Sequence, residues 1–136
     1  MKRLVFILSD YILIVDDNEN ILYLLHEFLI KDGYIIELAG SGVEALKIIN
    51  NRIPCLVLLD IKMPEMSGLE TLAKIRIISP CIPVVVISAY TELHLVQQAI
   101  KDNLIKYYIE KPFDLGKLRK LIQEVLQSHS YVQEAL

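Results

Sequence analysis

The sequence contains no tryptophan and little cysteine, glycine or proline: its 136 residues include two, five and five of these, respectively. So little glycine and proline excludes collagen-like and low-complexity chains. Two cysteines, Cys55 and Cys81, are too few for the disulfide framework of a small secreted domain. We therefore interpret both as reduced packing residues and expect a cytoplasmic protein.

A strong excess of one charge is also missing. Fourteen Lys and Arg residues stand against seventeen Asp and Glu residues, which gives a net charge of −3. A slightly acidic chain is a poor match for a phosphate backbone, so we expect no direct nucleic-acid binding. The basic cluster at residues 117–120 is interpreted as a solvated helix face.

Long hydrophobic runs are missing as well. The apolar residues 4–8 follow Lys2 and Arg3, as in a signal peptide, but the run stops at Ser9 after five residues. Such a run is too short for a signal peptide or a membrane span. We expect no membrane association and treat residues 1–10 as an extension of unknown structure.

The sequence is rich in short apolar runs that alternate with helical periods. Strands are expected at residues 11–15, 35–38, 55–59, 84–87 and 106–109. Helices are expected after the first strand up to Gly33, after a cap at Ser41, at 68–78, at 92–101 and after a cap at Asp114. The pattern predicts one α/β domain over 11–127 with a tail or helix end at 128–136. Five parallel strands would form a doubly wound, flavodoxin-like sheet with helices on both faces.

Chemically useful side chains follow four of the five predicted strands. Asp16 and Asp17 follow the first, Asp60 the third, Ser88 the fourth and Lys111 the fifth. Each alone has an ordinary explanation as a turn, cap or solvated residue. In parallel sheets, however, ligands bind beyond the carboxyl ends of the strands, so these side chains should converge on one edge.

Three neighbouring carboxylates repel one another unless a cation lies among them. Because no His or Cys accompanies them, the hard oxygen ligands select Mg²⁺, with Mn²⁺ possible. A carboxylate beside such an ion can attack a phosphoryl group as a nucleophile. Lys111 would offset charge on the phosphoryl oxygens, and Ser88 could donate a hydrogen bond to one of them.

Four segments in this order resemble the receiver domain of response regulators in two-component signalling: ILIVDDNENI, LVLLDIKMPEMSGLETLAKIR, VVVISAY and YYIEKPFD. The resemblance covers about residues 11–127 and implies the strand order 2-1-3-4-5. It also implies that Asp60 is the phosphoacceptor. Asp16 and Asp17 would hold Mg²⁺ together with Asp60, and the backbone carbonyl of Lys62 would complete the protein ligands.

The resemblance further implies that Ser88 is a switch hydroxyl and that Lys111 precedes a cis peptide at Pro112. Between Ser88 and Lys111 the chain has one residue more than is usual in the family, and Asn103 lies where a glycine is common. Asn tolerates the left-handed conformation. Counting forward from Ser88 places the switch aromatic at Tyr107, whereas strand alternation counted back from Lys111 favours Tyr108.

The partner implied by the resemblance is a histidine kinase, a histidine phosphotransfer protein or both. The chain would catalyse its own phosphorylation and dephosphorylation as a monomer or weak dimer. We expect an apolar border around the charged site to receive the partner: Ile21, Leu24, Tyr90, Pro112 and Phe113.

Several alternatives remain open. The sequence is similar to the single-domain phosphotransferase of the sporulation phosphorelay, so we expect a stand-alone relay intermediate. A receiver excised from a DNA-binding regulator is the main alternative. A haloacid dehalogenase-type phosphatase would need an Asp-x-Asp motif, which is missing at Asp16 and at Asp60. A flavodoxin-like cofactor binder would not carry acidic residues in its phosphate loop.

Overall fold

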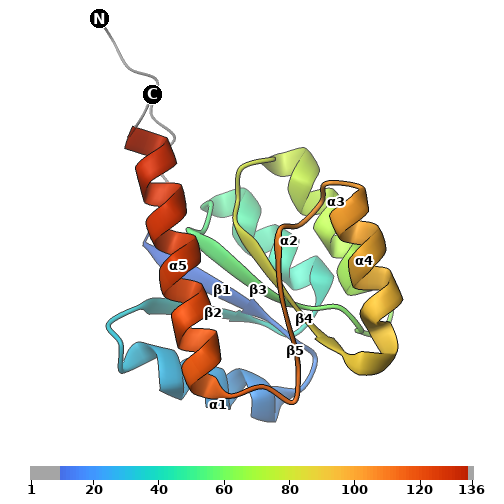
Figure 1. The fold of residues 1–136 in the computed structure, drawn as a ribbon, viewed down its shortest axis with the longest axis horizontal. Coiled ribbons are helices and arrows are strands. Elements are labelled where there is room, and N and C mark those ends of the chain that lie inside the picture. Colours follow the sequence, from blue (N-terminus) through green and yellow to red (C-terminus); the bar gives the residue numbers. More distant parts are fainter. Residues whose placement is uncertain (1–9, 135–136) are drawn as a thin grey trace, which may run out of the picture.

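The computed structural model describes residues 10–134, with side chains up to residue 128; all but the last residue of the expected extension 1–10 lies outside this range. Five parallel strands form one sheet in the order β2-β1-β3-β4-β5 (Figure 1). They are β1 (Tyr11–Val15), β2 (Ile35–Ala39), β3 (Leu56–Asp60), β4 (Val84–Ala89) and β5 (Tyr107–Lys111).

Helices cover both faces of the sheet, with α1 and α5 on one side and α2, α3 and α4 on the other (Figure 1). Their bounds are α1 (Glu19–Ile30), α2 (Gly42–Asn51), α3 (Gly68–Ile78), α4 (Leu93–Lys101) and α5 (Leu115–Glu134). A 3₁₀ turn, Tyr90–Glu92, precedes α4. The predicted fold class and strand order are confirmed.

Side-chain caps fix where the helices begin. Ser41 Oγ accepts from the backbone N–H of Glu44. The Glu44 carboxylate in turn accepts from Gly40 N–H, one residue before the Ser41 N–H that a reciprocal capping box would use. Asp114 Oδ1 accepts from Gly116 N–H at the start of α5, as expected. Each cap satisfies a backbone donor that the helix cannot pair internally.

The strands β1 and β3 are buried throughout because helices cover both of their faces. Leu22, Leu25 and Leu29 of α1 lie in the core, at the spacing of three and four residues that places side chains on one face of a helix. Leu24 is 50% exposed. Leu24 therefore lies outside the core stripe, which agrees with its expected place in the apolar border around the site.

Two further expectations need correction. Cys81 is exposed and does not pack in the core, whereas Cys55 is half-buried; neither forms a disulfide. Arg119, assigned to a solvated face, binds Asp32 across 2.8 Å and lies over the Phe28 ring, and so ties α5 to α1. Within residues 10–134, no helix is both long and apolar enough to cross a membrane.

Candidate functional site

The site lies at the carboxyl edge of the sheet, and three of its residues belong to the strands instead of following them. Asp60 ends β3, Lys111 ends β5 and Ser88 is the penultimate residue of β4. Each strand extends further toward its carboxyl end than predicted because its neighbour continues the ladder, with Asp60 opposite Ile87 and Lys111 opposite Ala89. A side chain held in a paired strand is placed more rigidly than one in a loop.

A glycine allows the start of α3 to pack against the backbone at Asp60. Gly68 begins α3, and its backbone N–H donates to the carbonyl of Ile61 at 2.9 Å. A Cβ at residue 68 would collide with the backbone oxygen of Asp60. Only glycine therefore lets α3 start this close to the end of β3.

The three aspartates converge as predicted. One carboxylate oxygen from each of Asp16, Asp17 and Asp60 lies within 4.8 Å of the other two. Asp16 and Asp60 are buried, at 2% and 5% exposure, whereas Asp17 is exposed. The acidic site therefore has a buried floor and one side open to solvent.

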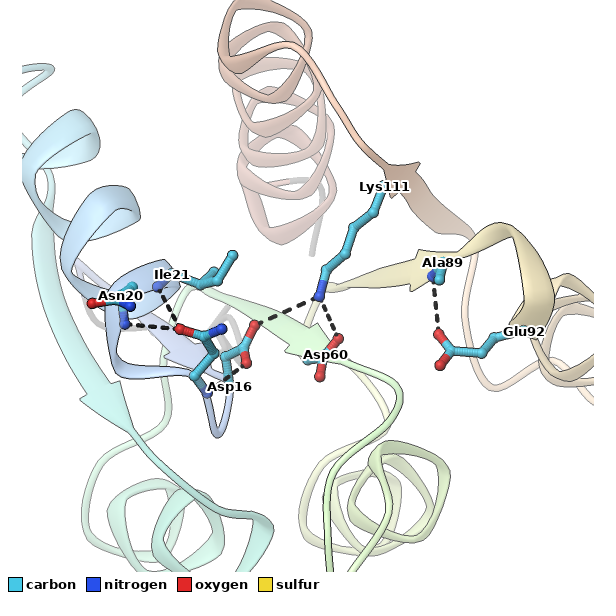
Figure 2. Close-up of polar contacts among 8 residues, drawn as sticks. Asp16, Asn20, Ile21, Asp60, Ala89, Glu92 and Lys111 are labelled. Carbon is cyan, nitrogen blue, oxygen red and sulfur yellow. Dashed lines mark hydrogen bonds and ion pairs between the residues drawn. The ribbon is translucent and has the colours of Figure 1, made fainter.

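The side chain of Lys111 extends to a position between Asp16 and Asp60, as Figure 2 shows. Its Nζ donates to Asp60 Oδ1 at 3.1 Å and lies 4.0 Å from Asp16 Oδ2. Burial raises the pKa of Asp60 to about 6, and the charge of Asp16 adds to this, while Lys111 opposes it. Burial also raises the pKa of Asp16. One lysine does not fully offset two buried carboxylates.

These residues fit a hard divalent cation. Asp16 Oδ1 accepts from Asn18 N–H, but Asp16 Oδ2 is buried and has no hydrogen-bond partner. An orphaned buried carboxylate oxygen beside two further carboxylates is a donor set of the kind that Mg²⁺ takes. Lys62, two residues beyond Asp60, has an exposed side chain. Its backbone carbonyl, which the resemblance implies as a ligand, lies on the same connection.

Ser88 is fully buried, and its Oγ has no hydrogen-bond partner. Tyr108 pairs with Val86, two residues before Ser88, and therefore shares the Ser88 face of the sheet. Tyr107 instead packs against the core cluster of α1 and α5. The peptide before Pro112 is cis, and Asn103 has a φ of 58°, in the left-handed region, as expected.

The expected apolar border is only partly exposed. Leu24 and Tyr90 are 50% and 75% exposed, and Pro112 is also exposed. Ile21 and Phe113 are half-buried and pack against the core cluster of α1 and α5. The border thus combines free apolar side chains with side chains that already serve the fold.

The sequence reasoning missed Glu92. This residue is 8% exposed, and its Oε1 accepts from the backbone N–H of Ala89 at 2.9 Å. Glutamate three residues after the start of a helical segment has the spacing of a capping box. That spacing could have identified it, although Ala89 lacks the Ser or Thr hydroxyl of the usual motif.

Comparison with known proteins adds to this geometry. The family model of the response regulator receiver domain matches residues 12–123. The chain belongs to this family. The receiver is 37% identical over 119 residues to Sporulation initiation phosphotransferase F of Bacillus subtilis (strain 168), covering 88% of this chain and 95% of that protein. Membership of the receiver family excludes two of the alternative functions, the haloacid dehalogenase-type phosphatase and the flavodoxin-like cofactor binder.

Receiver domains that form part of larger proteins are equally similar to this chain. The chain is 37% identical to Transcriptional regulatory protein ZraR of Klebsiella oxytoca, with 91% of this chain covered but only 28% of that protein. Among solved structures, a CheY-like receiver domain protein from Methanospirillum hungatei JF-1 matches with a TM-score of 0.84 and 32% identity, covering 90% of this chain and 97% of the other. The receiver domain of NtrX from Brucella abortus matches with a TM-score of 0.80 and 34% identity, and the match covers 85% of this chain and 98% of the other.

Proposed function

We propose that this receiver accepts a phosphoryl group from a phosphohistidine onto Asp60, with Mg²⁺ held by Asp16, Asp17, Asp60 and the Lys62 carbonyl. The convergence of three carboxylates within 4.8 Å, with Lys111 on Asp60, carries this proposal. Incubation with Mg²⁺ and acetyl phosphate, followed by intact-mass measurement, tests it directly.

In the proposed step, an Asp60 oxygen attacks phosphorus while the bond from phosphorus to the donor nitrogen breaks. The imidazole leaves and takes up a proton, and an aspartyl phosphate remains. When bound, Mg²⁺ would supply positive charge to the phosphoryl oxygens. Lys111 moves from an Asp60 oxygen toward a phosphoryl oxygen, and the buried hydroxyl of Ser88 gains an acceptor. The side chain of Tyr108, which lies on the same face of the sheet as Ser88, then moves in the same direction as the Ser88 side chain.

Further, we propose that the donor and acceptor of the phosphate are a histidine kinase and a histidine phosphotransfer protein, as in a phosphorelay. The 37% identity to Sporulation initiation phosphotransferase F, across almost its whole length, supports this role. Equal identity to the ZraR receiver supports the alternative, a receiver that controls a DNA-binding regulator. Transfer from phosphorylated Asp60 to an added phosphotransfer protein separates the two.

We expect Lys62→Asn to shorten the lifetime of the aspartyl phosphate severalfold. Hydrolysis needs a water in line with the bond from Asp60 to phosphorus, and Lys62 and Tyr90 are bulky, exposed side chains two residues beyond Asp60 and Ser88. Neither is a carboxylate or amide that could orient the water. A smaller side chain with an amide would admit and hold it.

Loss of labelled phosphate over time, after removal of the donor, measures this lifetime. Tyr90→Ala should shorten it as well, and Lys101→Asn, at the far end of α4, is the matched control. Lifetimes equal to wild type in both site variants would show that these side chains do not shield the phosphate.

For the partner, we expect Leu24→Ala to slow phosphotransfer from a phosphorylated kinase about tenfold, the loss of one interface anchor. Labelling by acetyl phosphate should continue at the wild-type rate. Leu24 is 50% exposed, so truncation should hardly change the melting temperature. Ile21→Ala also removes packing against the core, so its effect on transfer is mixed with an effect on stability.

The transfer rate from kinase, divided by the rate from acetyl phosphate, is the quantity to compare. Ile77→Ala is a suitable control, because Ile77 is exposed on α3 and lies outside the proposed border. A Leu24 variant with an unchanged ratio would remove this face from the docking surface.

A further inference from the structure

Glu92 makes a contact, here called the Glu92 clasp, that the proposed chemistry leaves unexplained. Its Oε1 accepts from the backbone N–H of Ala89, and Figure 2 shows this contact beside the Asp60 site. Among the described residues, no Lys, Arg or His forms an ion pair with Glu92. A buried carboxylate without a cation is destabilising, and the hydrogen bond from the Ala89 N–H offsets part of that cost.

What the clasp holds is the end of β4. Ala89 directly follows Ser88, whose Oγ is buried and unpaired, and Ile87 before it lies opposite Asp60 in the ladder. An unpaired buried hydroxyl costs free energy, and an acceptor placed on Asp60 would relieve that cost. With Ala89 N–H fixed by Glu92, the backbone at Ser88 has little freedom to turn toward such an acceptor.

The clasp is also within electrostatic reach of Asp60. The negative charge of Glu92 also raises the pKa of Asp60, although burial and the charge of Asp16 raise it more. An aspartyl phosphate carries about two negative charges where ionised Asp60 carries one, so phosphorylation would add about one negative charge to this edge. The repulsion of the buried Glu92 carboxylate would therefore exceed that of Asp60 alone.

We propose that the Glu92 clasp stabilises the unphosphorylated position of the β4–α4 connection and opens when Asp60 carries a phosphoryl group. Opening frees the Ala89 backbone, so that Ser88 can donate its hydroxyl to a phosphoryl oxygen. Glu92 is thus a positioning residue that acts through Ser88. The inference rests on the proposed function of Asp60 as phosphoacceptor.

Beryllofluoride with Mg²⁺ serves as the probe, because it mimics a phosphoryl group on a carboxylate, and calorimetry measures its affinity. Glu92→Met preserves length but removes the acceptor of the clasp. We expect it to bind the probe about tenfold more tightly, since it loses a hydrogen bond that only the unliganded state makes. In a Ser88→Ala background, the same substitution should change the affinity less than twofold, within the error of additivity.

The matched control is Glu44→Met. Glu44 Oε2 accepts from Gly40 N–H at 3.1 Å at the start of α2, the same kind of contact on an exposed turn. The Glu44→Met substitution should leave the affinity for beryllofluoride unchanged. If Glu92→Met does not fold, Glu92→Gln carries the test, because it removes the charge and weakens the clasp; it should bind severalfold more tightly.

The outcomes separate the two claims. A wild-type protein that does not bind beryllofluoride would overturn the proposed function, and the inference with it. A wild-type protein that binds, with Glu92 variants of equal affinity, would overturn the inference alone. A gain in affinity that persists in full without the Ser88 hydroxyl would show that Glu92 does not act through Ser88, and would also overturn it.

Discussion

Asp60→Asn should abolish phosphorylation by acetyl phosphate and by any phosphorylated kinase. The amide nitrogen and oxygen of Asn keep the shape of the side chain but are too weakly nucleophilic to attack phosphorus. Wild-type protein should gain one phosphate per chain in the presence of Mg²⁺, as measured by intact mass. Chelation of Mg²⁺ should suppress the gain, because the three carboxylates then lack their cation.

Asp102→Asn is the matched control for this experiment. Asp102 is exposed at the end of α4, where it accepts from Gln98, far from the strand ends that build the site. It should be labelled like wild type. Normal labelling of Asp60→Asn would falsify the assignment, and labelling of wild type without Mg²⁺ would show that the aspartates do not need a metal.

The second large effect concerns stability, which we expect to fall as pH rises through the pKa of Asp60. In the fold this pKa is about 6, mainly because of burial, against an ordinary value of 3.8. The native state binds the proton more tightly than the unfolded state between these values, so the free energy of unfolding decreases with pH there. Ionisation of Asp60 lowers the free energy of unfolding by about 3 kcal/mol above pH 6 and by about half that amount at pH 5.

Asp60→Asn removes this cost, so the variant should be more stable than wild type without Mg²⁺, by up to about 3 kcal/mol at pH 8. The gain should be smaller at pH 5. Mg²⁺ should stabilise wild type more at pH 8 than at pH 5, because protons compete with the metal below pH 6. Urea unfolding at both pH values, with and without Mg²⁺, measures all three quantities.

Asp102→Asn again provides the reference, with no pH-dependent gain expected. If the difference in stability between Asp60→Asn and wild type were the same at pH 5 and pH 8, Asp60 would not have a raised pKa. A wild-type protein indifferent to millimolar Mg²⁺ would count against the metal site itself.

The sequence alone determined the order of the elements and the side chains that meet at one edge. Apolar runs and helical periods are local signals, and five alternations of the two leave a parallel sheet as the solution that buries both faces. Once the strands are parallel, Asp16, Asp60 and Lys111 must lie at the same edge. For this reason the fold and the acidic site could be predicted without coordinates.

Only the tertiary structure decided how each of these residues is buried and held. Asp16 and Asp17 are neighbours in the chain, yet one is buried and the other exposed, because packing by distant strands sets their surroundings. The same holds for Leu22, which is buried in the core although the sequence analysis did not assign it there, and for Glu92, whose side chain turns inward onto Ala89. Periodicity fixes which residues share a face, but burial, and with it the pKa of Asp60, depends on groups that come together only when the chain folds.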